Sequence, residues 1–97
     1  MDSERQRALA VLRAAHRFPM IYEISVIALT TPEITAAVRA AVAAGVSEPL
    51  GADDHQTVPS RGGKYTSHRF RIPCLDAESV LDLIARVRAV EGVVTTL

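Results

Sequence analysis

The segment GGKYTSHRFRI, residues 62–72, decides the fold of this chain. Its two glycines permit the tight turn of a β-hairpin. Apolar and polar residues then alternate, as they do along a strand with one buried face, so the segment predicts a strand over residues 64–72. The expected inward residues are Phe70, Ile72 and Cys74, and the expected outward residues are Tyr65, Ser67, Arg69 and Arg71. His68 has the parity of Phe70 and is therefore expected at the edge of the core.

The residues before this hairpin predict a weaker strand and a loop. Residues 55–58 contain little apolar surface, and Pro59 follows them without a backbone amide to donate. Both features favour a strand at the edge of a sheet, where a missing donor does no harm. Residues 47–54, which include Pro49 and Gly51, are typical of a loop.

Further toward the N-terminus, the sequence predicts a strand followed by a helix. Residues 20–28 alternate in the same way, with Ile24 and Val26 on the inward face. The helix begins after Thr31, whose hydroxyl can cap its first turn. Apolar residues then recur at helical spacing until Gly45, a natural stop.

Two more helices and one strand complete the expected elements. Asp76 is suited to cap a helix that Gly92 closes, and residues 93–97 form a last short strand. At the start of the chain, residues 3–16 predict an amphipathic helix that Pro19 ends.

The order of these elements predicts the architecture. After the first helix the chain runs strand, helix, strand, strand, helix, strand, which is a split βαβ arrangement of the α+β class. We expect four antiparallel strands in the order 4-1-3-2 with two helices on one face. The right-handed crossover rule selects this hand. Residues 1–17 are then a helical extension, and residues 18–97 form the βαββαβ domain.

Composition excludes several classes of protein. The 97 residues are enough for one domain, and 48% of them are hydrophobic with no net charge, which argues against disorder. The balanced charge gives no bias toward nucleic acid, and no apolar run is long enough to span a membrane. The single cysteine excludes an internal disulfide, and no apolar signal core follows the polar start. The expected location is the cytoplasm.

The chain resembles the YbeD-like family, small bacterial proteins of unassigned function. The likeness rests on Phe18-Pro19 before a strand containing Tyr22, on the hairpin PSRGGKYTS at residues 59–67, and on the ending EGVV at residues 91–94. It implies a ferredoxin-like fold similar to regulatory ACT domains. ACT domains that bind amino acids usually carry an Asp and a Gly around a Pro after the first strand. Here residues 29–33, LTTPE, have only the proline.

The outward row of the hairpin strand is the first candidate site. Tyr65, Ser67, Arg69 and Arg71 can bind a small anion on an open sheet face, because arginine matches carboxylate and phosphate groups. The other candidate residues are in the neighbouring turns: Ser60, Arg61, Thr30 and Thr31. The alternative is that this face is only solvated and that Glu23 pairs across it with Arg69 or Arg71.

No pattern predicts catalysis, a metal or a cofactor. Asp53, Asp54 and His55 supply at most two useful ligands, so a polar loop explains them better than a metal site. Cys74 is expected to be a small buried residue, because nothing in the sequence places His16 or His68 beside it as a base. The protein is therefore expected not to be an enzyme.

The predicted function is a non-enzymatic regulatory or protein-interaction module, expected to be a homodimer. The edge strands, the helix flanks and the N-terminal helix all offer surfaces for pairing. The alternative is an ACT-like sensor of a small anionic metabolite, a carboxylate or a phosphate. RNA binding is less favoured, because Tyr65 is the only aromatic residue on the outward face. No membrane partner is expected.

Overall fold

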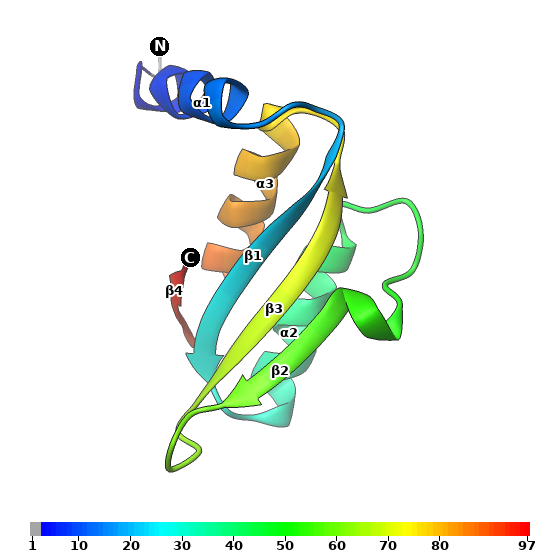
Figure 1. The fold of residues 1–97 in the computed structure, drawn as a ribbon. Helices are drawn as coiled ribbons and strands as arrows, with labels where there is room; N and C mark the ends of the chain where they lie inside the picture. Colours follow the sequence, from blue (N-terminus) through cyan, green and yellow to red (C-terminus); the bar gives the residue numbers. More distant parts are fainter. Residues whose placement is uncertain (1–2) are drawn as a thin grey trace.

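The structure of the protein is a computed structural model, in which residues 3–97 are described. Its helices are α1 (Ser3–Ala15), α2 (Pro32–Ala43) and α3 (Ala77–Arg88), with one short 3₁₀ helix, η1 (Ala52–Asp54). Its strands are β1 (Met20–Leu29), β2 (His55–Pro59), β3 (Tyr65–Cys74) and β4 (Val93–Thr96). Figure 1 shows these elements in the order in which the sequence predicts them.

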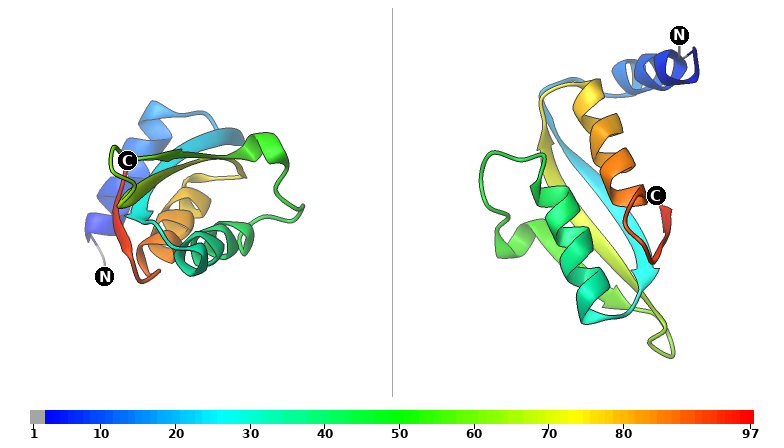
Figure 2. Two further views of the ribbon diagram at one scale, coloured as in Figure 1. Left: turned by 90° about the horizontal axis from the view of Figure 1, so that it is seen from below. Right: turned by 180° about the vertical axis from the view of Figure 1, so that it is seen from behind.

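The four strands form one antiparallel sheet in the order β2-β3-β1-β4. This is the predicted order 4-1-3-2 read from the other edge. The two long strands, β1 and β3, pair along their whole length, and the short strands lie at the edges. Helices α2 and α3 lie side by side on one face of the sheet (Figure 2). The α+β, ferredoxin-like fold is thus confirmed.

Local signals at the helix starts and at the hairpin turn act as predicted. Thr31 Oγ1 accepts a hydrogen bond of 3.0 Å from the amide of Ile34, and Asp76 Oδ1 accepts one of 2.8 Å from the amide of Ser79. The turn between β2 and β3 contains Gly62 and Gly63 with φ of +96° and +76°. Residues with a Cβ rarely adopt such angles, so the two glycines make the hairpin possible.

Most element ends differ from the prediction by one or two residues, and two differences are larger. Helix α3 ends at Arg88, before the predicted stop at Gly92. Gly92 instead turns the chain into β4 with a φ of +95°, while the Ile34 side chain packs where a Cβ would stand. The second difference is η1, which forms inside the predicted loop 47–54 because the Asp54 carboxylate accepts a hydrogen bond of 2.8 Å from the amide of Gly51.

The core lies between the sheet and helices α2 and α3. The buried residues of this cluster are Ile24, Val26, Ala28, Val38, Val42, Phe70, Ile72, Cys74, Val80, Leu83 and Val87. The inward faces predicted for both long strands are therefore confirmed. The prediction that His68 lies at the edge of the core is wrong, because its side chain is fully buried. Its neighbours on β3 and β2 cover it, and no pattern of alternation distinguishes a core position from its margin.

Helix α1 lies against α3 of the same chain (Figure 1). Leu9 is buried there, and two ion pairs join the helices: Arg13 to Glu78 at 2.7 Å and Arg5 to Asp82 at 3.7 Å. None of the helices in residues 3–97 is long and apolar enough to cross a membrane.

Candidate functional site

Helices α2 and α3 cover one face of the sheet (Figure 2), and the opposite face is here called the open face. The four residues of the predicted anion-binding row lie together on the open face. They are alternate residues of β3, and on β1 they stand opposite Leu29, Ile27, Ser25 and Glu23 in turn. Thr66, His68 and Phe70, which lie between them in sequence, are buried on the other side of the strand. The structure thus places both predicted arginines on the solvent side.

The charges on the open face are partly paired. Arg71 Nη1 lies 3.0 Å from Glu23 Oε1, the cross-strand pair anticipated for a solvated face. Both side chains are more than half exposed, so this pair contributes little to stability. Arg69 stands opposite Ser25 on β1 and Gln56 on β2, and it has no hydrogen-bond or ion-pair partner within residues 3–97. Of the two arginines in the row, Arg71 is therefore paired and Arg69 is not paired within residues 3–97.

The other half of the open face is apolar. Ser67 stands between Ile27 on β1 and Val58 on β2, and Leu29 stands opposite Tyr65. Val58 is 48% exposed and Leu29 is 37% exposed. We call Ile27, Leu29, Val58 and Tyr65 the apolar end of the open face. A sheet face that only meets water normally carries polar residues at such positions.

Three of the other candidate ligands already hold the fold together. Thr31 caps α2, as described above. Ser60 Oγ accepts a hydrogen bond of 3.1 Å from the amide of Tyr65 and so closes the hairpin turn. Thr30 Oγ1 lies 2.7 Å from Thr66 Oγ1. Arg61 is exposed in the turn. Ser60 and Thr30 thus lie beside the Tyr65 end of the row, with their hydroxyls already hydrogen-bonded within the chain.

A chain of polar side chains that sequence reasoning missed runs from α2 into the core. Arg39 Nη1 lies 2.8 Å from His55 Nδ1, and His55 Nε2 lies 3.0 Å from His68 Nδ1. Arg39 also donates to the carbonyl of Leu50 at 3.1 Å. The His55 ring stacks on Phe70 with their centroids 4.1 Å apart. Only the register between β2 and β3, together with the position of α2, brings these residues together.

The chemistry of arginine determines where the protons of this network lie. Arg39 can only donate, so His55 Nδ1 accepts and His55 Nε2 donates to His68 Nδ1. The remaining proton of His68 is then on Nε2, which is buried without a partner in the part of the chain that the structure describes. Burial, followed by the charges of His68 and Arg39, lowers the pKa of His55 to about 4, and burial also lowers the pKa of His68. Both rings are therefore neutral at pH 7.

Asp53, Asp54 and His55 have separate roles. Asp54 bonds to Gly51, and His55 belongs to the network with Arg39 and His68. Within residues 3–97, no three His, Cys, Asp or Glu side chains gather in a way that could hold a metal ion. Cys74 is 2% exposed, and burial raises the pKa of its thiol. The thiol is therefore protonated at neutral pH, as in a cysteine that serves packing.

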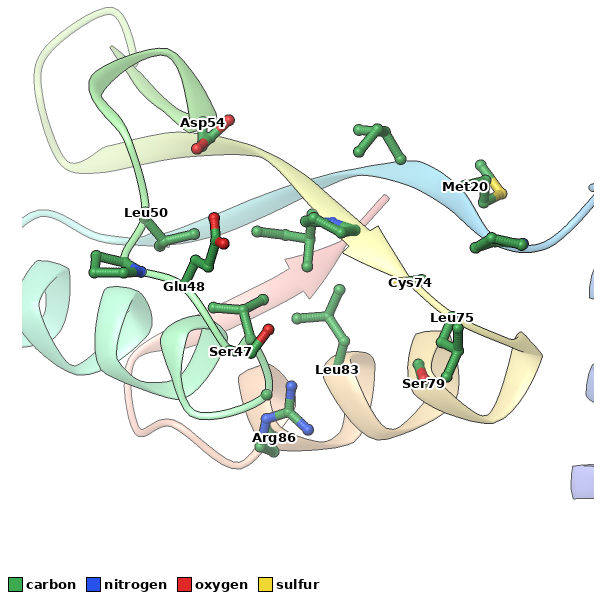
Figure 3. Close-up of a pocket in the computed structure, with 17 residues that line it drawn as sticks. Met20, Ser47, Glu48, Leu50, Asp54, Cys74, Leu75, Ser79, Leu83 and Arg86 are labelled. Carbon is green, nitrogen blue, oxygen red and sulfur yellow. The ribbon is translucent and has the colours of Figure 1, made fainter.

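A pocket of about 860 Å³ lies between the sheet, the loop that follows α2, and α3 (Figure 3). Ile72 and Cys74 of β3 line it together with Leu83 of α3. Val46 and Leu50 close it from the loop, and Arg86 of α3 supplies a positive charge. The sequence carries no signal for this pocket, because its walls come from three elements whose packing alone creates the space.

A family model described as a protein of unknown function (DUF493) matches residues 13–97, from the last turn of α1 to the end of the chain. No curated protein matches the sequence.

Proposed function

We propose that this chain, which belongs to the YbeD-like family of proteins of unknown function (DUF493), is a non-enzymatic regulatory or protein-interaction module that works as a homodimer. The cytoplasm is its proposed location. The observation that supports pairing is the composition of the open face, which combines the apolar end with charges of both signs.

A two-fold interface joins the same surface of both copies, so that surface must be complementary to itself. The apolar end offers Val58 and Leu29 for burial against a second copy. Beside it, Glu23 and Arg69 provide opposite charges, so that Glu23 of one copy can pair with Arg69 of the other. Helix α1 is less suited to this role, because Leu9 is already buried against α3 of its own chain.

A charge at the apolar end is expected to separate the copies. Val58→Asp places a carboxylate where the proposed interface is driest, and it should raise the dimer dissociation constant by on the order of 10-fold or more. Sedimentation velocity and light scattering over a wide range of concentrations measure this.

Val11→Asp is the matched control, because Val11 is also an exposed valine and the substitution makes the same chemical change on α1, outside the open face. It should dimerise like the wild type. A wild type that stays monomeric at high concentration would refute the dimer. Equal effects of the two substitutions would refute the open face as its interface.

Arg69 supports a second candidate function, a sensor of small anions on the open face. An exposed guanidinium without a partner can bind phosphate or carboxylate through two parallel hydrogen bonds. Inorganic phosphate should then shift the backbone amide NMR signals of β3 around Arg69, and Arg69→Ala should remove the shift. Arg61→Ala, which removes an exposed arginine of the hairpin turn, should leave it intact. Equal losses in both variants would indicate nonspecific charge attraction and contradict the site.

A further inference from the structure

We propose that the pocket beside α3 binds a small organic anion with an apolar body and one carboxylate, and that Arg86 holds the carboxylate. This site is separate from the open face, and it does not depend on dimerisation.

Among the described residues, Arg86 carries an unpaired charge at the wall of the pocket. Its side chain is half-buried, and within residues 3–97 no carboxylate lies within 4.0 Å of it. A charged side chain that is withdrawn from water normally has a partner, because losing its hydration without a compensating interaction costs free energy. Arg86 lines a pocket that is large enough to admit such a partner.

The chain itself holds the Arg86 guanidinium in place. Arg86 Nε donates to the carbonyl of Ala41 at 2.9 Å, and the guanidinium packs against the backbone of Gly45, where a Cβ would stand. The terminal nitrogens, Nη1 and Nη2, have no acceptor in the described part of the chain. A guanidinium that is fixed at Nε loses little freedom when its free nitrogens bind a carboxylate.

The charge of Arg86 acts inside the pocket. Cys74 lies on the pocket floor, and its pKa is raised by burial but drawn back down by the positive charge of Arg86. Two acidic residues, Glu48 and Asp54, also line the pocket. Glu48 is exposed and its carboxylate points away from Arg86 in Figure 3, so water screens its repulsion of an anion.

The remaining walls select the body of the ligand. Ile72 and Leu83 form an apolar floor beside Cys74, and Leu50, Leu75 and Met20 extend it. The volume of about 860 Å³ lies in the range of pockets that hold organic molecules, roughly 300–1,000 Å³. An inorganic anion would leave these walls unfilled. A carboxylate on an apolar chain or ring matches both the walls and the charge.

The experiment compares 4-phenylbutyrate with its neutral analogue 4-phenylbutanol. Both are titrated into the full chain while the backbone amide signals are followed by NMR. The acid should shift amides of residues 45–50 and 74–86, and the alcohol should bind on the order of 10-fold or more weakly because it lacks the charge-assisted hydrogen bonds.

Arg86→Gln should weaken the binding of the acid by about 10- to 100-fold. It should also abolish the difference in affinity between the acid and the alcohol. Arg88→Gln is the control, because Arg88 is exposed on the same helix and bonds to Thr96. It should bind like the wild type. The acid–alcohol comparison on the wild type tests the charge even if Arg86→Gln folds poorly. Equal binding of both probes, no binding, or shifts confined to the open face would overturn the proposal.

Discussion

Phe70→Ala is expected to lower the free energy of unfolding by about 3–5 kcal/mol, the usual cost of removing a buried phenylalanine. Phe70 is 1% exposed in the centre of β3, where β1 and β2 flank it on both sides. The loss also removes the ring on which His55 stacks. Chemical denaturation followed by circular dichroism measures the change. In a domain of this size the loss is a large fraction of the total stability.

Phe70→Leu separates the two effects of this substitution. Leucine keeps most of the apolar volume but has no ring for His55, so the variant should be clearly more stable than Phe70→Ala. An unfolding free energy for Phe70→Ala within about 1 kcal/mol of the wild-type value would show that Phe70 does not lie at a packed centre of the core.

Acidification is expected to destabilise the protein between pH 6.5 and about 4. The pKa of His55 is lowered to about 4 in the fold, and that of His68 is lowered as well, so the unfolded chain binds these protons at higher pH than the folded chain does. Stability is therefore complete above the unfolded pKa of about 6.5 and is lost as pH falls toward the folded values. Each proton that the chain takes up on unfolding adds at most about 1.4 kcal/mol per pH unit to the slope of the unfolding free energy against pH. Denaturation at a series of pH values measures it.

The structural reason is the direction of the hydrogen bonds. His55 Nε2 donates to His68 Nδ1, and Arg39 donates to His55 Nδ1. A second proton on His55 would sit on Nδ1 and face the Arg39 guanidinium, and a second proton on His68 would sit on Nδ1 and face the N–H of His55. Both conflicts disfavour the charged form of the ring. His55→Phe should reduce the slope between pH 6.5 and about 4, while His16→Gln, at the third histidine and outside this network, should not. A wild type whose stability is constant over this interval would contradict the network.

The two proposals concern different surfaces, and their tests can fail separately. Val58→Asp acts on the open face, whereas Arg86→Gln acts on the pocket beside α3. A monomer that still binds 4-phenylbutyrate would keep the pocket and remove the dimer. A dimer that does not bind 4-phenylbutyrate would keep the homodimer and remove the ligand pocket.

Some structural roles follow from the sequence because they depend on neighbouring residues alone. Alternation along residues 64–72 and 20–28 separates buried from exposed faces, since side chains along a strand point to opposite sides in turn. Thr31 and Asp76 cap helices because each meets an amide three residues ahead. The order of elements then leaves few ways to connect one sheet, and the observed order is among them. The division at residues 17 and 18 stays a prediction.

Other features appear only when distant segments meet. His68 is buried, with a neutral ring, because β2 brings His55 beside it and α2 brings Arg39, and those contacts depend on strand register and helix placement. Arg86 is a surface residue in any helical pattern, yet the loop after α2 folds over it and leaves its charge facing a pocket. Thr30 resembles a ligand in the sequence, but a tertiary hydrogen bond to Thr66 occupies its hydroxyl. Local chemistry determines which face a side chain takes, whereas its environment depends on what packs across from it.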